Sequence, residues 1–373
     1  MKISVITLHD SQNYGSCLQA FATQEKLKQF AQDVEFINYR RGNSTIWGYF
    51  KDNLPLKSFI LLPSLIRWRR VFGGFLKCCI NLTTSCYASE SDFEKFPLHD
   101  GYYCVGSDQI WNSKYNEGII PPYYLSFVPD GKKTFTFSSS FGEEWLDDNE
   151  VALTKMYFER FDQISVREDG ALRIVNEQYG CHNAVQLVDP TLAIPPDFWR
   201  RHAPKTKIKG DYILVYSLDY NGICEILNND FDTYAKELSR RTGLPLVRLC
   251  KRYDQAVRCG KSVLIPDVLR FVTLIDNAKY VLTNSFHATA FSMNLNTEPI
   301  VLPPKKGFGR LTSFLRLVNE EYRFIADFDN YDIVSHRADF EHVNKVLDNE
   351  RKRVDDFLYS VFRKETYAHD SDH

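Results

Sequence analysis

The sequence has no long uninterrupted apolar stretch. Its most apolar run, 59–66, contains Pro63 and stops at Arg67, well short of the roughly 20 residues that a membrane-spanning helix needs. The first residues, MKISVITLHD, are typical of a strand rather than of a signal peptide. We therefore expect a cytoplasmic protein without a membrane span.

A strong charge of either sign is also missing, because 46 basic and 48 acidic residues leave a formal net charge of −2. That balance gives no reason to expect nucleic acid as a partner. The nine cysteines include no CxxC pair, and the cysteines and histidines lack the spacing typical of metal ligands. We therefore expect reduced thiols, no bound metal and no cofactor.

The chain is too long for one ordinary core, since it has 373 residues of which 44% are apolar. Strand and helix patterns alternate along both halves, as in parallel sheets with crossover helices. We predict an α/β fold with two Rossmann-like domains facing a cleft, one at 1–195 on the acceptor side and one at 196–335 on the donor side. Prolines and cations at 195–210 indicate the boundary. Residues 336–373 would form a C-terminal helix and tail that can pack back on the first domain.

The first domain opens as a βαβ unit, with a strand at 3–8, a helix at 17–31 and a strand at 34–38. The loop after the first strand carries Asn13 and Gly15. Such a loop opens into the ligand crevice, and Gly15 would let the backbone approach a bound group closely. We assign both residues to the acceptor side, although an Asn-x-Gly sequence is also common in ordinary turns.

Residues 47–80 form an insertion in which aromatic and aliphatic residues are interleaved with lysines and arginines, and acids are almost absent. A basic amphipathic segment of this kind can lie on an anionic membrane surface. The alternative is a helical insertion that packs on its own domain and leaves its cations in solvent. Both interpretations stay open from the sequence.

Two more strand ends in this domain carry polar residues. A strand at 102–105 leads into GSDQIWN, which places Ser107, Asp108 and Trp111 close together. Asp108 could accept a proton from a hydroxyl, or could equally cap a short helix, and Trp111 offers an apolar face to a sugar ring. Arg167 stands between a strand and a helix, where it could clamp a carboxylate or phosphate or pair with a neighbouring acid.

The most informative stretch of the second domain is YVLTNSFHATAFSM at 280–293. It predicts a strand, a polar corner and a helix whose N-cap is Ser285. The free amides of such a helix start attract phosphate or carboxylate. His287, in the first turn, would then be a proton donor beside an anion site, or simply a histidine packed in the helix start.

The motifs GSDQIWN, SSSFG, SVREDGA, VDPTLA and TNSFHATAFSM occur in this order. With them the chain resembles the polysaccharide pyruvyl transferase family, from NYGSCLQA to GRLTSFL. The resemblance implies a GT-B-like fold and transfer of pyruvate from phosphoenolpyruvate to a hexose of a surface polysaccharide precursor, as a cyclic ketal. It also implies Arg167 and His287 at the phosphoenolpyruvate site and Asp108 as an essential acid on the facing domain.

One departure from the family pattern concerns charge. Members of known activity often have Arg-Leu-His where this chain has Ser285-Phe286-His287, so one cation is missing from the donor site. Arg310, or failing that Lys305 or Lys306, would supply it. The expected donor-binding residues are Arg167, Ser285, Phe286, His287, Arg310 and Lys306, and the expected acceptor-binding residues are Asn13, Gly15, Ser107, Asp108 and Trp111.

The chemistry of ketal formation gives two residues a catalytic role. The methylene carbon of phosphoenolpyruvate must be protonated, for which His287 is the expected acid, and Asp108 is the expected base for a sugar hydroxyl. The acceptor can be polyprenyl-linked, with the protein in peripheral contact with the inner membrane. Alternatives are a GT-B glycosyltransferase that uses a nucleotide sugar and a non-catalytic relative in polysaccharide assembly. A Cys–His hydrolase has the least support, since no cysteine has an activating context.

Overall fold

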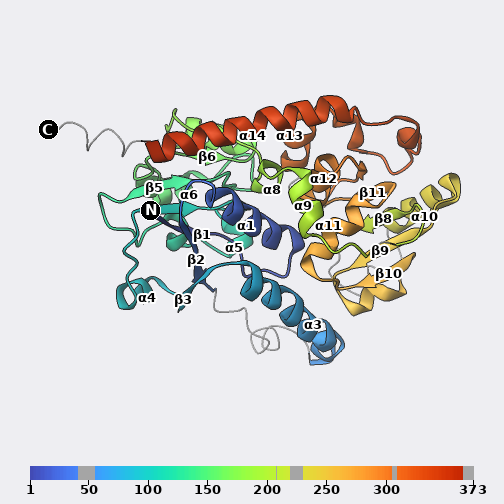
Figure 1. Ribbon diagram of the computed structural model, residues 1–373, viewed down its shortest axis with the longest axis horizontal. Helices are drawn as coiled ribbons and strands as arrows, with labels where there is room; N and C mark the ends of the chain where they lie inside the picture. The colour runs from blue at the N-terminus through green and yellow to red at the C-terminus, as the bar shows by residue number, and fades with distance from the viewer. Residues whose placement is uncertain (41–54, 207, 219–229, 305–308, 364–373) are drawn as a thin grey trace.

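The computed structural model describes residues 1–40, 55–206, 208–218, 230–304 and 309–363, with side chains described from residue 61 onward in the segment that starts at 55. Two five-stranded parallel sheets lie side by side along the long axis of the molecule (Figure 1). The first contains β1 (Lys2–Ile6), β2 (Asp33–Tyr39), β3 (Leu82–Tyr87), β4 (Tyr102–Val105) and β5 (Lys133–Thr136). The second contains β8 (Ile213–Tyr216), β9 (Leu246–Cys250), β10 (Lys261–Leu264), β11 (Tyr280–Thr283) and β12 (Glu298–Val301).

Both sheets have the same topology. The strand orders are β3-β2-β1-β4-β5 and β10-β9-β8-β11-β12, and β6 (Ser165–Val166) pairs with β7 (Val185–Gln186) in a short third sheet. In each large sheet the chain order reverses beside the central strand, between β1 and β4 and between β8 and β11. Ligands of open parallel sheets bind at that point, outside the carboxyl ends of the strands.

The central strands are apolar because helices cover the sheet on both faces. All four residues of β8, ILVY, are buried, as are those of β4, YYCV. The principal helices are α1 (Tyr14–Leu27), α3 (Pro55–Cys79), α4 (Glu90–Lys95), α5 (Ser113–Asn116), α6 (Asp148–Phe158), α7 (Asp169–Arg173), α8 (Pro190–Ala193), α9 (Pro196–His202), α10 (Asp230–Thr242), α11 (Val268–Asp276), α12 (Phe286–Asn294), α13 (Gly309–Leu317) and α14 (Phe340–Phe362). Short 3₁₀ turns lie at Pro121–Tyr124, Tyr253–Val257, Glu321–Arg323 and Asp332–Ser335, and a π-helical turn at Ile174–Gln178.

The largest hydrophobic core is shared by the two halves. Tyr14 of α1 stacks on Phe271 of α11, with ring centroids 5.4 Å apart, and its hydroxyl donates to the Pro266 carbonyl at 3.0 Å. This apolar contact fixes the first sheet against the second, so the cleft between them has a defined width. The boundary at 195/196 stays a prediction, because the core is continuous across it.

The helix α14 runs across both halves along one side of the molecule (Figure 1). Near its end, the Phe362 ring contacts Tyr102 of β4 at 5.2 Å between centroids. Nearer its middle, Arg351 Nη2 donates to Asn294 Oδ1 of α12 at 2.8 Å. The helix therefore ties the two sheets together.

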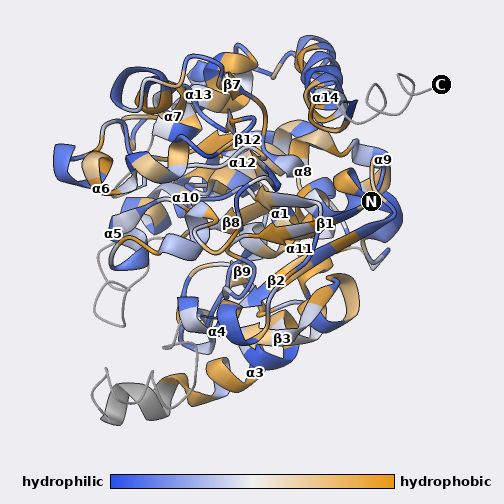
Figure 2. Cartoon of the chain, turned by 90° about the vertical axis from the view of Figure 1, so that its left-hand side faces the viewer, coloured by the Kyte–Doolittle hydropathy of each residue, from blue (hydrophilic) through white to orange (hydrophobic). Residues whose placement is uncertain are grey.

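The described part of the 47–80 insertion is α3, which projects from one edge of the molecule and carries both hydrophobic and hydrophilic residues (Figure 2). Its Leu65 and Phe72 are buried in the protein, and Trp68 Nε1 donates to the Lys251 carbonyl at 2.5 Å. These contacts favour the structural interpretation of the segment. Ile66 is 58% exposed, and contact with a membrane surface stays a prediction; residues 47–54 lie outside the described part.

Within the described residues, no helix has both the length and the apolar character that crossing a membrane requires.

Candidate functional site

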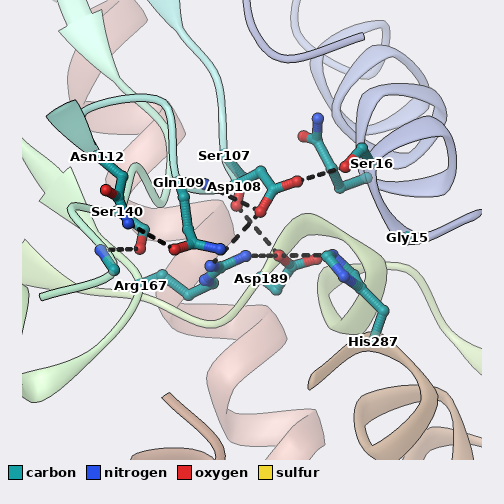
Figure 3. A network of polar contacts seen from close by, with 12 residues as sticks. Gly15, Ser16, Ser107, Asp108, Gln109, Asn112, Ser140, Arg167, Asp189 and His287 are labelled. Atoms are coloured by element: carbon teal, nitrogen blue, oxygen red, sulfur yellow. Dashed lines mark hydrogen bonds and ion pairs between the residues drawn. The ribbon is translucent and has the colours of Figure 1, made fainter. Parts of the chain in front are cut away.

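A cavity of about 150 Å³ lies between the two sheets, at the carboxyl ends of their central strands. Both halves contribute to its walls, and Figure 3 shows a network of polar contacts that includes the lining residues Asp108, Gln109 and His287. Its lining residues are Leu8, Asn13, Ser16, Asp108, Gln109, Tyr115, Leu218, Asn284, Ser285, Phe286, His287, Pro304, Arg310 and Leu311. The switch points of the two sheets therefore face one shared space.

His287 lies in this cavity because of how α12 begins. Strand β11 ends at Thr283, and Ser285 caps the helix as predicted, its Oγ accepting from the Ala288 amide at 3.4 Å. His287 follows in the first turn and is nearly buried. Its Nε2 lies 3.6 Å from Asp189 Oδ2, and within the described residues it has no hydrogen-bond partner.

The other side of the His287 ring packs against the start of α1. Asn13 caps this helix, its Oδ1 accepting from the Gly15 amide at 2.9 Å. A Cβ atom on Gly15 would stand 2.1 Å from His287 Nδ1. The sequence predicted that Gly15 lets the backbone approach a bound group, and that stays a prediction; in the structure the group that Gly15 approaches closely is the imidazole of the second half.

We expect Gly15→Ala to push the His287 ring out of place and to reduce turnover on the order of a hundredfold, as misplacing a reacting group by about 1 Å can do. The fold should survive, because the clash is confined to one side chain. Steady-state rates and thermal unfolding measure the two effects. The matched control is Gly101→Ala, since a Cβ at Gly101 meets nothing within 4 Å; equal activity of both variants would contradict the contact.

Asp108 follows β4 and has a left-handed backbone, with φ of 72°, which is uncommon for a residue other than glycine. Its Oδ2 accepts from Ser16 Oγ at 2.6 Å, and its Oδ1 accepts from the Gln109 amide at 2.9 Å. The next helix, α5, is capped by Asn112, so Asp108 is not a helix cap. Burial acts to raise the pKa of Asp108, but His287 and Arg167 hold it below its usual value, so the group is a carboxylate at neutral pH.

Arg167 follows β6 and is surrounded by carboxylates. Its Nη1 donates to Asp189 Oδ2 at 2.8 Å, its Nε donates to Glu168 Oε2 at 3.3 Å, and its Nη2 is 3.9 Å from Asp108 Oδ1 without a described hydrogen-bond partner. The guanidinium lies over the Phe286 ring at 4.5 Å. Burial acts to lower the pKa of Arg167, and the three acids raise it above its ordinary value. Arg167 does not line the main cavity but a small space that shares Phe286 and Arg310 with it. Of its nitrogens, only Nη2 is without a described hydrogen-bond partner.

Asp189 is the residue that sequence reasoning missed. It is fully buried, bridges Arg167 and His287 (Figure 3), and caps α8 by accepting from the Thr191 amide at 3.0 Å. Burial acts to raise its pKa, but His287 and Arg167 hold it far below the usual range. The VDPTLA corner, an acid directly after a strand, was the available signal.

Three of the five expected acceptor residues, Gly15, Ser107 and Trp111, do not line the cavity. Ser107 is fully buried, and its Oγ donates to Asp189 Oδ2 at 3.1 Å, so it supports that carboxylate. Trp111 is 1% exposed, packs against aromatic rings that include Phe158, and donates from Nε1 to the Tyr123 carbonyl at 2.9 Å. The prediction that Trp111 stacks on a sugar is therefore wrong, because both faces of its ring are covered.

Arg310 is the cation of the main cavity. It is partly exposed, the terminal amide of Gln109 lies 3.0 Å from both its Nη1 and Nη2, and its Nε is without a described partner. Burial and the nearby Arg167 lower its pKa, so an anion bound here would relieve an unfavourable charge. Lys305 and Lys306 lie outside the described residues.

A family model described as polysaccharide pyruvyl transferase matches residues 13–306. A search of curated proteins found no match. The UDP-N-acetylglucosamine 2-epimerase of Rickettsia bellii is 9% identical over 97% of each chain, with a TM-score of 0.53. The Neisseria meningitidis UDP-GlcNAc 2-epimerase bound to UDP-GlcNAc is 10% identical over 96% of this chain and 100% of that one, with a TM-score of 0.51. At these identities the likeness concerns the fold alone, and it confirms the predicted GT-B-like architecture.

Proposed function

Because this chain belongs to the polysaccharide pyruvyl transferase family, we propose that it transfers pyruvate from phosphoenolpyruvate to a hexose of a surface polysaccharide precursor and forms a cyclic pyruvyl ketal. The observation that carries the proposal is the cavity itself. It brings a helix-start histidine, His287, together with a carboxylate, Asp108, and a cation, Arg310, from both halves of the chain. An acid, a base and an anion-binding group are what the reaction requires.

The size of the cavity supports a small donor. Its volume of about 150 Å³ is below the roughly 300 Å³ at which pockets for drug-sized ligands begin. A three-carbon phosphate ester suits this space better than a nucleotide sugar does, and this argues for the pyruvyl donor over the glycosyltransferase alternative.

The described side chains of the site include more carboxylates than arginines, so binding of an anionic donor requires further positive charge. Among the described residues, Arg167 and Arg310 face the carboxylates Asp108, Glu168 and Asp189. The amides at the start of α12 add positive character. We propose that Lys305 or Lys306 adds the remaining charge.

In the proposed reaction, His287 gives a proton to the methylene carbon of phosphoenolpyruvate, and the adjacent carbon becomes oxocarbenium-like. A sugar hydroxyl adds to that carbon while Asp108 takes its proton. The bond to phosphate then breaks, and a second hydroxyl of the same sugar adds and loses its proton, which closes the ketal. Of the two hydroxyl protons, one balances the new methyl group and the other leaves with phosphate.

Asp189 and Arg167 would position His287 for this reaction. Asp189 faces His287 Nε2 at 3.6 Å and accepts from Arg167 at 2.8 Å. A buried carboxylate beside the ring can fix the orientation of the imidazole for the proton transfer. A polyprenyl-linked acceptor and contact with the inner membrane stay predictions.

We expect the purified protein to bind phosphoenolpyruvate in calorimetric titration and to ignore a panel of nucleotide sugars. Mass spectrometry of candidate acceptors after incubation with phosphoenolpyruvate should then show the added pyruvyl ketal. Uptake of a nucleotide sugar without uptake of phosphoenolpyruvate would favour the glycosyltransferase alternative, and uptake of neither would favour the non-catalytic one.

A further inference from the structure

A second and larger cavity, of about 610 Å³, lies at the carboxyl edge of the first sheet. The loop after β1, the end of β2, Ala88 after β3 and the segment after β4 form its walls. It shares Leu8 and Tyr115 with the 150 Å³ cavity, so the two spaces adjoin. Its lining residues are Thr7, Leu8, His9, Asp10, Ser11, Gln12, Tyr39, Ala88, Tyr115, Asn116, Glu117, Ile120 and Tyr123.

The two cavities differ in charge. The described lining of the larger one includes the carboxylates Asp10 and Glu117 and has no lysine or arginine; Arg40 stands behind Asp10, with Nε 4.0 Å from Oδ2. The smaller cavity holds Arg310 and His287 together with one carboxylate, Asp108. A bound anion can pair with Arg310 there, whereas in the larger cavity it would meet carboxylates without a described cation in the lining. The carboxylates, amides and hydroxyls of the larger cavity suit a neutral ligand with many hydroxyl groups.

His9 gives the larger cavity a buried polar group. It is 1% exposed, and its Nδ1 lies 3.1 Å from the Thr7 carbonyl. Its Nε2 is buried within the protein. Burial lowers the pKa of His9 and Arg40 lowers it further, against Thr7, Asp10 and a side-chain hydrogen bond with Asn38, which raise it, so the ring is neutral.

We propose that the larger cavity binds the sugar unit of the acceptor as an uncharged polyol, whose hydroxyls bond to the carboxylates, amides and hydroxyls of the lining. The aromatic side chains of Tyr39, Tyr115 and Tyr123 provide apolar ring surface in the same walls. Any phosphate attached to the sugar lies outside this cavity. The assignment rests on the proposed function, because that reaction defines the acceptor, and it replaces Trp111 as the sugar-binding element.

Ala88→Trp tests the assignment, because Ala88 is exposed and lines the larger cavity, so an indole there fills the space without disturbing the core. The probes are methyl glycosides of neutral hexoses and, separately, hexose 1-phosphates, followed by saturation-transfer NMR. We expect the neutral glycosides to bind the wild-type protein. The variant should bind them about tenfold more weakly or worse, a change of about 1.4 kcal/mol. The matched control is Ala256→Trp, an exposed site that lines neither cavity.

A second variant, Glu117→Gln, keeps the size of an exposed side chain of the lining and removes its carboxylate. We expect it to weaken glycoside binding while calorimetric titration with phosphoenolpyruvate is unchanged. Equal glycoside binding by wild type and Ala88→Trp, binding of hexose phosphates alone, or no glycoside binding at all would overturn the proposal. The two proposals can fail separately. If Ala88→Trp weakens glycoside binding but the wild-type protein does not bind phosphoenolpyruvate, the larger cavity is a sugar site and the proposed function is wrong.

Discussion

Replacing His287 with glutamine is expected to cut turnover by roughly a hundredfold or more, which is the usual contribution of a positioned proton donor. Glutamine can still hydrogen-bond a phosphate, so phosphoenolpyruvate binding should weaken only modestly. A fall in kcat with a nearly unchanged affinity is the signature of a group that acts in the transition state. Initial rates and calorimetric titration measure the two quantities.

The matched control is His182→Gln, because His182 is exposed and lines neither of the two cavities described above. Its turnover should equal that of the wild type. If His287→Gln also retains full turnover, the histidine is structural, and the acid must lie elsewhere in the cleft.

Arg167→Ala is expected to lower the free energy of unfolding by about 3–5 kcal/mol, the usual cost of leaving a buried charge without its partner. Three buried carboxylates, on Asp108, Glu168 and Asp189, lose their shared counter-charge in this variant. Phosphoenolpyruvate binding should weaken as well, by about 2–5 kcal/mol, if Nη2 contacts the donor in a desolvated pair. Urea unfolding and calorimetry separate the two losses.

The same variant has an expected pH dependence. The folded-state pKa of Asp189 is depressed, so this carboxylate stabilises the wild type above its unfolded pKa of about 3.9. That stability is lost as the pH falls toward the folded value. Without Arg167 the depression is smaller, so the stability gap between wild type and variant should be full at pH 7 and shrink below about pH 4.

The control for stability is Arg173→Ala. Arg173 pairs with Glu144 at 2.7 Å, and both side chains are more than half exposed. Such surface pairs contribute at most about 1 kcal/mol. A loss in Arg167→Ala no larger than in this control would show that the buried carboxylates do not depend on Arg167.

Local features of the site could be predicted from the sequence. The strand, corner and helix of 280–293 and the Ser285 cap depend on residues adjacent in the chain. Each follows from a short-range rule about periodicity or capping. The match is good because no distant partner is needed to specify these elements.

Features that depend on distant partners could not be predicted. Trp111 is covered by rings such as Phe158, about 50 residues further on, and the sequence around the indole does not reveal them. Asp189 gains its place in the site only when β7 brings it beside Arg167 and His287. The edge strand β10, with sequence KSVL and a half-exposed pattern, lacks the apolar run that marks a central strand.

The shared core around Tyr14 and Phe271 restricts movement of the two halves relative to each other. Swinging one sheet away from the other would uncover this stacked pair and detach α14 from Asn294 or from Tyr102. Exposing that much apolar surface is costly. The two halves therefore form a rigid unit, in which the distance between His287 and Asp108 is set before any ligand binds. In the proposed reaction, the entropic cost of aligning these two groups is met during folding rather than at each turnover.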